Sequence, residues 1–261
     1  MNPISSAKEQ FDRQAAQYNQ RWAGWSDETL QRMRELADPQ ASWQVLDVAT
    51  GTGFTALAFA PLVAQVTGAD FSPGMLAQAE KRAKEQGVTN VSWVEASAEK
   101  LPFPDSAFDL VTVRIAPHHF TDVRAFLSET RRVLKPGGVF VLGDTTVPDD
   151  DTEAADWQNT VERERDPSHV ENLTPKTWRT LTEAAGFRVT DIETREGAIH
   201  IALTPWLETS GTIGKQAERV RWLFWNAPET ARRHFQITTD ADGETHFAWQ
   251  RVVLRTVTAE V

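Results

Sequence analysis

The chain has 261 residues, of which 27 are basic and 37 acidic, so its formal net charge is −10 at pH 7. So acidic a chain lacks the basic surface that binds nucleic-acid phosphates or anionic lipids, which argues against both as partners. It has no cysteine, which excludes disulfides, thiolate nucleophiles and cysteine zinc sites. The apolar stretches are too short for a membrane span and no secretory signal is evident, so we expect a cytoplasmic protein.

The first two thirds of the chain alternate between strand and helix patterns. Residues 5–36 carry apolar side chains at helical spacing and predict two amphipathic helices. Helical patterns follow at 54–63, 73–87 and 123–134, with Pro61 shortening the first of them. Short apolar runs at 44–50, 66–70, 91–97, 109–116 and 139–144 predict strands. This alternation predicts right-handed crossovers and an α/β fold with a doubly wound, Rossmann-like sheet.

The last third is less regular. A helical stretch runs to about Arg165, and a second helix begins at Pro175 after the N-cap Thr174. Residues 187–196 and 245–257 have strand patterns, and residues 206–235 between them have helical spacing. We expect a seven-stranded, mainly parallel sheet whose last strand is antiparallel. N-terminal helices and a helical insertion before the last strand would form a lid.

A glycine turn follows the first predicted strand. In the segment LDVATGTG, Gly51 and Gly53 let backbone amides approach a ligand at the N-terminus of a helix. Ala49 precedes them, and an alanine predicts a negative φ at that position. Asp70 ends the second strand, where it can accept hydrogen bonds from ribose hydroxyls or, alternatively, cap the next helix. These features also fit nicotinamide and flavin dinucleotides.

Two further segments are more specific. The loop ASAEKLPFPD at 96–105 follows the third strand and can contact an adenine ring, although a plain surface loop is the alternative. The helix of residues 123–134 ends in VLKPGG. Four segments, LDVATGTG, GADFSPGMLAQA, ASAEKLPFPDSAFDLV and ETRRVLKPGG, resemble class I S-adenosylmethionine-dependent methyltransferases of the ubiquinone/menaquinone-biosynthesis type. RIAPHHF, RDPSHV and the C-terminal insertion more weakly resemble a bacterial branch, the YcgJ-like proteins.

The resemblance implies S-adenosylmethionine as cofactor, S-adenosylhomocysteine as product and no metal. It also implies one methyltransferase domain over 1–261, with a helical cap at 1–40, a cofactor-binding core at 41–145 and a C-terminal part with substrate-side insertions at 146–261. The acidic run at 149–151 is expected to be a solvated loop. The resemblance further implies a set of cofactor-binding residues around the methionine end, the ribose, the adenine and the floor of the site. They are Asp47, Ala49, Gly51, Gly53, Asp70, Phe71, Met75, Ala98, Glu99, Arg114 and Ile115.

The acceptor side carries histidines and aromatic residues. His119 and His118 follow the fourth strand, at the sheet edge where open α/β folds bind ligands. Either one could act as a general base for an acceptor that must lose a proton, with His119 the slightly preferred candidate, or could merely cap a helix or pack in a loop. Four residues are candidates for the acceptor pocket, with core or loop packing as the alternative: Tyr18, Trp22, His169 and Trp206.

These observations predict methyl transfer to a small molecule, with the accepting atom carbon, oxygen or nitrogen. Two alternatives stay open: an oxidoreductase that uses a nicotinamide dinucleotide, and a cofactor-binding module without transferase activity. We expect neither a nucleic-acid partner nor stable membrane insertion, and a homodimer is compatible with the sequence.

Overall fold

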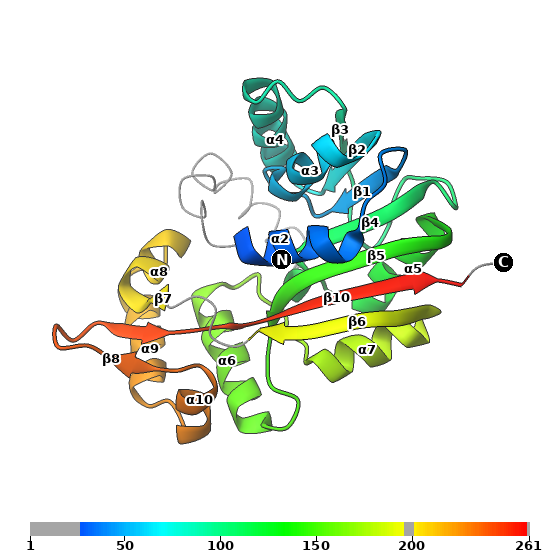
Figure 1. The fold of residues 1–261 in the computed structure, drawn as a ribbon. Helices are drawn as coiled ribbons and strands as arrows, with labels where there is room; N and C mark the ends of the chain where they lie inside the picture. The colour runs from blue at the N-terminus through cyan, green and yellow to red at the C-terminus, as the bar shows by residue number, and fades with distance from the viewer. Residues whose placement is uncertain (1–26, 196–200, 260–261) are drawn as a thin grey trace.

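The central feature of the computed structural model, which describes residues 27–195 and 201–259, is a seven-stranded sheet (Figure 1). Its strand order is β3-β2-β1-β4-β5-β10-β6. β10 pairs antiparallel with both β5 and β6, and the pairs among the first five strands are parallel. The predicted mainly parallel sheet with an antiparallel last strand is confirmed. The bounds are β1 Gln44–Val48, β2 Gln65–Asp70, β3 Val91–Glu95, β4 Phe108–Arg114, β5 Leu134–Thr146, β6 Phe187–Arg195 and β10 Gln250–Thr258.

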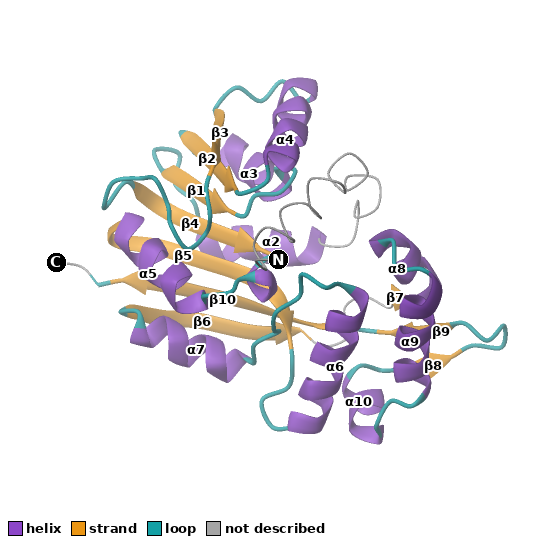
Figure 2. Cartoon of the chain, turned by 180° about the vertical axis from the view of Figure 1, so that it is seen from behind, coloured by secondary structure: helices purple, strands orange, loops and turns teal. Residues whose placement is uncertain are grey.

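Helices cover both faces of this sheet, because successive strand residues point to opposite sides. Val45 and Val141 pack with α2 and α3, whereas Leu46 and Leu142 pack with α5 and α7. Figure 1 shows α2 in front of the sheet, and Figure 2 shows α5 and α7 on the opposite face. Pro61 lies in a short 3-10 turn that ends the helical segment after β1, as predicted. The bounds are α2 Asp27–Ala37, α3 Phe54–Phe59, α4 Pro73–Glu85, α5 Val123–Val133 and α7 Pro175–Ala184.

A helical insertion before the last strand is also confirmed. It packs on α6 (Thr152–Arg165), beyond the edge toward which the parallel strands point (Figure 1). The core that it shares with α6 is aromatic, with Trp157, Trp206, Phe224, Phe247 and Trp249 among its buried members. The insertion comprises β7 Ile201–Ala202, α8 Leu203–Ser210, α9 Gly214–Trp225, α10 Glu229–His234, β8 Thr238–Thr239 and β9 Thr245–Phe247.

The insertion contains a second sheet that the sequence did not predict. Its strands pair in the order β7-β9-β8 and are only two or three residues long. Strands so short do not produce a readable alternation of apolar and polar residues. Of the two helices predicted within residues 5–36, the structure describes α2, and the part before residue 27 lies outside the described residues. Among the described residues, no helix is long and apolar enough to cross a membrane.

Trp93 on β3 packs over two glycines, Gly53 at the N-cap of α3 and Gly68 on β2. A Cβ atom at Gly68 would lie 2.5 Å from Cζ3 of Trp93, and one at Gly53 would lie 2.8 Å from Cη2. Gly68 stands directly opposite Trp93 in the β2–β3 register. Both glycines therefore make room for the indole ring, which sets how closely the turn after β1 approaches β2 and β3.

We predict that Gly68→Ala lowers the free energy of unfolding by about 1–3 kcal/mol, because the new methyl group collides with the indole ring. The measurement is urea unfolding of the variant, of Trp93→Ala and of the double variant. In the Trp93→Ala background the same glycine substitution should cost much less. Equal costs in the two backgrounds would show that the ring is not the obstacle.

Candidate functional site

The turn between β1 and α3 is supported from below by a buried carboxylate. Asp47 is 1% exposed, and its two oxygens accept hydrogen bonds from the Thr50 hydroxyl at 2.6 Å and the Thr112 hydroxyl at 2.7 Å. Burial raises the pKa of Asp47 to about 6, while the two hydroxyl donors and the nearby charge of Arg114 oppose that rise. Asp47 therefore ties the turn to β4.

Two residues with side chains adopt the left-handed backbone region at this edge of the sheet. The predicted negative φ at Ala49 is wrong, because φ is +51°. The reversal at Ala49 lets the amide of the next residue donate to the Ala69 carbonyl on β2, at 3.0 Å. Ile115, just after β4, has φ +49°. A left-handed conformation costs roughly 1–2 kcal/mol for such residues, and strain of this kind concentrates at functional sites.

Asp70 and Gly51 connect the ends of β2 and β1. The Asp70 carboxylate accepts hydrogen bonds from the Gly51 amide at 2.8 Å and from the Ser72 amide at 2.9 Å. The N-cap of α4 is Ser72, whose hydroxyl accepts from the amide of the buried Met75. Gly51 has φ +54°, and no described residue lies within 4 Å of the place where a Cβ would stand. The backbone at Gly51 thus faces open space beside a carboxylate.

The loop after β3 lies next to the end of β2. The Ala96 amide donates to the Asp70 carbonyl at 2.9 Å, which holds the start of this loop against the strand. Ala98 is buried, and Phe71 and Glu99 are partly exposed. The residues expected on the adenine side therefore belong to two segments that the structure joins.

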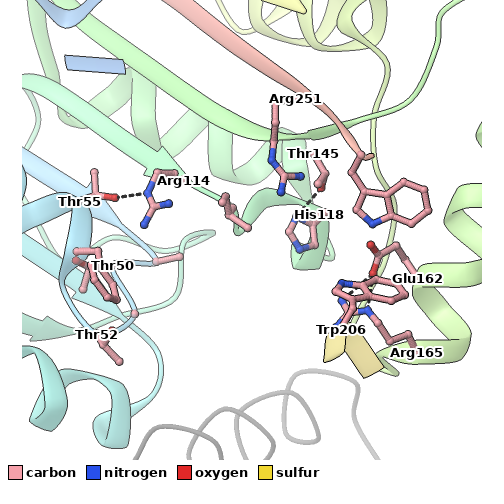
Figure 3. A pocket seen from close by; sticks show the side chains of 15 residues that line it. Thr50, Thr52, Thr55, Arg114, His118, Thr145, Glu162, Arg165, Trp206 and Arg251 are labelled. Atoms are coloured by element: carbon pink, nitrogen blue, oxygen red, sulfur yellow. Dashed lines mark hydrogen bonds and ion pairs between the residues drawn. The ribbon is translucent and has the colours of Figure 1, made fainter. Parts of the chain in front are cut away.

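A cleft opens between this turn and the insertion. It holds about 910 Å³ of empty space, its solvent-open mouth included, and Figure 3 shows the glycine turn on one wall and α6, α8 and β10 on the other. Six of the residues expected from the sequence line it: Ala49, Gly51, Arg114, Ile115, His118 and Trp206. The other lining residues are Thr50, Thr52, Phe54, Thr55, Thr145, Glu162, Arg165, Trp249 and Arg251.

His118 lies on the cleft and forms a buried pair with Asp144 at the end of β5. Its Nδ1 is 2.7 Å from one carboxylate oxygen, and its backbone amide donates to the other at 3.0 Å. Burial disfavours the imidazolium, but the charge and hydrogen bond of Asp144 outweigh burial and raise the pKa of His118 above 6.5. Asp144 was missed from the sequence, although an acidic residue ending a buried strand was the available signal.

His119 and His169 pack behind His118 instead of lining this cleft. The Nδ1 atom of His119 is 3.1 Å from the Ser168 carbonyl, and Nε2 of His169 is 3.0 Å from Oδ1 of Asn159. Burial, followed by the neighbouring histidines, lowers the pKa of His119 to about 4 and that of His169 to about 2. Both rings are therefore neutral near pH 7, and of the two histidines considered as base, His118 reaches the cleft.

The wall opposite the glycine turn carries arginines and tryptophans. Arg165 donates to the Glu162 carboxylate at 2.7 Å and stacks 4.6 Å from the Trp206 ring centroid. Trp249 and Arg251, both near the start of β10, complete this wall. Neither was selected from the sequence, although an arginine within an apolar strand pattern was a signal for Arg251.

Two other tryptophans of the insertion do not line the cleft in the described part of the chain. Trp225 on α9 is 84% exposed and Trp222 is 51% exposed, so both face solvent. Tyr18 and Trp22 lie outside the described residues.

Two residues of the acidic run at 149–151 accept hydrogen bonds from backbone amides at the N-termini of α6 and α7. Asp151 is the N-cap of α6 and accepts from the Ala154 amide at 3.0 Å, and Asp149 accepts from the Lys176 amide at 2.9 Å. Within the described ranges, no group of three or more histidine or acidic side chains could hold a metal ion.

We predict that Asp144→Asn lowers the pKa of His118, because the Asp144 charge stabilises the imidazolium against the cost of its burial. The measurement is an NMR titration of the imidazole signals, with His118→Gln used to assign the resonance. The signal of His246, which pairs with Asp240 and does not line the cleft, serves as an internal reference. An unchanged His118 pKa in the variant would contradict the pairing.

Comparisons of the sequence with known proteins identify methyltransferases as its relatives. A family model described as a methyltransferase domain matches residues 46–142. The chain is 35% identical over 234 residues to the uncharacterized methyltransferase YcgJ of Bacillus subtilis, covering 90% of this chain and 91% of that protein. It is 45% identical over 113 residues to a demethylmenaquinone methyltransferase of Thermus thermophilus, covering 42% of this chain and 51% of that protein.

Solved structures give the same result over nearly the whole fold. The crystal structure of YcgJ aligns with a TM-score of 0.83 at 33% identity, and covers 90% of this chain and 99% of that one. A putative methyltransferase from Bacillus halodurans aligns with a TM-score of 0.84 at 30% identity and the same coverage. The four ordered sequence segments, the sheet topology and these relatives agree, and the chain belongs to the class I S-adenosylmethionine-dependent methyltransferases.

Proposed function

We propose that this enzyme methylates a small molecule whose accepting atom loses a proton, and that His118 takes that proton. The observation that carries the proposal is the His118–Asp144 pair, which lies on the same cleft as the glycine turn. The family assignment supports methyl transfer and leaves the nicotinamide-dependent alternative without support. The accepting atom remains carbon, oxygen or nitrogen.

The residues around the glycine turn fit S-adenosylmethionine. The Asp70 carboxylate accepts from the backbone amides of Gly51 and Ser72, which fixes a hydrogen-bond acceptor for a ribose hydroxyl at the end of β2. Gly51 leaves open space where a methionine moiety can approach the backbone. When bound, the cofactor supplies a methyl group activated by its sulfonium sulfur. We assign the ribose to Asp70, the adenine to Phe71, Met75, Ala98 and Glu99, and the methionine end and floor to Ala49, Gly51, Arg114 and Ile115.

Asp47 and Gly53 shape this site from behind in our proposal. The Asp47 oxygens already accept from two threonine hydroxyls, and the space beside Gly53 is occupied by Trp93. We therefore assign cofactor binding to residues 41–145 of a single domain. Acceptor binding falls to residues 146–261, which supply the opposite wall.

The acidic partner of His118 prepares it to act as a base. Because Nδ1 is bonded to Asp144, the hydrogen on Nδ1 leaves the lone pair on Nε2. Figure 3 shows the His118 ring directed into the cleft. As the methyl group bonds to the acceptor, the displaced proton is transferred to Nε2, and the resulting imidazolium is stabilised by Asp144. His118 and the walls also align the acceptor and exclude water, which is the main gain in this reaction.

We predict that Asp70→Ala weakens binding of S-adenosylhomocysteine by roughly 1–3 kcal/mol, because ribose hydroxyls and the Gly51 amide lose their acceptor. Isothermal titration calorimetry measures this affinity. Asp109→Ala is the matched control, because Asp109 lies at the start of β4 and binds Lys135 outside the cleft. Equal affinity of the Asp70 variant and the wild type would remove Asp70 from the site.

We predict that His118→Gln slows turnover by roughly 10²–10⁴-fold while S-adenosylhomocysteine still binds. Turnover is measured as release of S-adenosylhomocysteine with an extract of small molecules as acceptors. A base acts only when unprotonated, so wild-type activity should be lost as the pH falls through the raised pKa of His118, above 6.5, and this step should be absent in the variant.

The control is His234→Gln, because His234 also contacts an acidic residue, Asp151, at 3.2 Å but does not line the cleft. It should keep wild-type turnover and the wild-type pH profile. Full activity of His118→Gln would show that no base is needed at this position.

A further inference from the structure

Arg251 is a buried cation that faces the cleft. It is 6% exposed, lies opposite Thr145 in the β5–β10 register and lines the cleft. Its Nε and Nη1 atoms have no hydrogen-bond partner within the described part of the chain. Figure 3 shows the guanidinium beside Thr145 and His118.

This arrangement is unfavourable for the protein alone. A buried charge without a partner costs several kcal/mol, and burial accordingly lowers the pKa of Arg251 despite the nearby negative charges of Asp144 and Glu162. An arginine nevertheless stays charged in proteins. A buried, unpaired guanidinium that faces a cleft is therefore expected where a ligand supplies the missing anion.

The nearby carboxylates already have other partners. Asp144 accepts from His118 and from the Thr145 amide, and Glu162 accepts from Arg165. Arg251 forms no ion pair with any residue that the structure describes. Its own protein surroundings thus leave two buried donors, Nε and Nη1, without a partner in a side chain that lines the cleft.

Trp249 adds a second donor on the same wall. It lies two residues before Arg251, just ahead of β10, and both side chains line the cleft. Its indole Nε1 is buried and has no partner among the described residues. The rings of Trp249 and Trp206 also provide an apolar surface beside these donors, with centroids 5.9 Å apart.

We propose that Arg251 and Trp249 bind a carboxylate of the methyl acceptor, so that the substrate is a small carboxylic acid with an apolar body. The inference rests on the proposed function and specifies the acceptor. Guanidinium groups pair well with planar carboxylates. Glu162 lines the same cleft, and its charge opposes a doubly charged phosphate more strongly than a carboxylate.

The methionine carboxylate of the cofactor is the other source of this chemistry. Arg114 lies on the glycine-turn side, where it donates to Thr55 at 2.9 Å, whereas Arg251 lies on the opposite wall beside His118. This placement favours the acceptor as the ligand of Arg251. The experiment has to separate the two sources.

The test uses four probes, benzoate and indole-3-acetate with their neutral amides, titrated into protein saturated with S-adenosylhomocysteine. We expect the wild type to bind at least one carboxylate more tightly than its amide. Arg251→Met should weaken that binding about tenfold or more, because the charged partner is lost. Arg251→Lys should retain part of the affinity, and affinity for S-adenosylhomocysteine should stay unchanged in both variants.

The matched control is Arg255→Met on the same strand, because Arg255 donates to Thr190 and does not line the cleft. It should bind the carboxylate as the wild type does. Without ligands, Arg251→Met should unfold at the wild-type Tm or above it, because an unpaired buried charge is removed. A structural arginine would give a lower Tm.

Three results would overturn the proposal. The first is equal binding of carboxylates and amides by the wild type. The second is weaker binding of S-adenosylhomocysteine by Arg251→Met with carboxylate binding intact, and the third is a clear drop in the Tm of Arg251→Met. The second result would assign Arg251 to the cofactor. Because probe binding is measured without turnover, failure of His118 as a base leaves this test valid, whereas absence of S-adenosylhomocysteine binding would refute the proposed function first.

Discussion

The antiparallel pairing of β10 with β5 determines the geometry of the cleft. β10 lies between β5 and β6 and is hydrogen-bonded on both sides, so its position in the sheet cannot shift without breaking two ladders. The pairing sets residue 251 opposite residue 145, next to the Asp144 carboxylate that holds His118. The same strand leads out of the aromatic insertion, and it therefore places the insertion over the ends of β1 and β4.

The electrostatics of the cleft follow from burial around one carboxylate. Three histidine rings lie together, with His118 4.2 Å from His119 and 5.5 Å from His169 between ring centroids. Three buried imidazolium groups at such distances would repel one another. His118 is hydrogen-bonded to the Asp144 carboxylate, and its pKa is raised while those of the other two are lowered. One ring is thereby equipped for proton transfer, and its two neighbours are structural.

Backbone strain lies on the other side of the cleft. Ala49 and Ile115 adopt positive φ at the carboxyl ends of neighbouring parallel strands, and both line the cleft. The hydrogen bonds of Asp47 to Thr50 and Thr112 join the same two strands just beneath them. A buried, fully bonded support can hold a strained backbone in one conformation. The rigid wall of the cleft thus faces a wall that carries the titratable and charged groups.

The sequence by itself determined the alternation of strands and helices, the glycine turn and the acidic residue at Asp70, because these features depend on neighbours in the chain. It also placed a histidine pair at the correct sheet edge. Between His118 and His119 it slightly preferred His119, because the contact that distinguishes His118 is made by Asp144, which lies 26 residues farther along the chain. The positive φ of Ala49 and the short strands of the insertion likewise leave no local pattern. In the sequence, Arg251 is one charged residue in an apolar strand pattern. The pairing of β10 with β5 brings its guanidinium to a cleft whose opposite wall is the glycine turn after β1. Only the tertiary structure could decide this contact, because contacts between distant segments depend on packing and strand register.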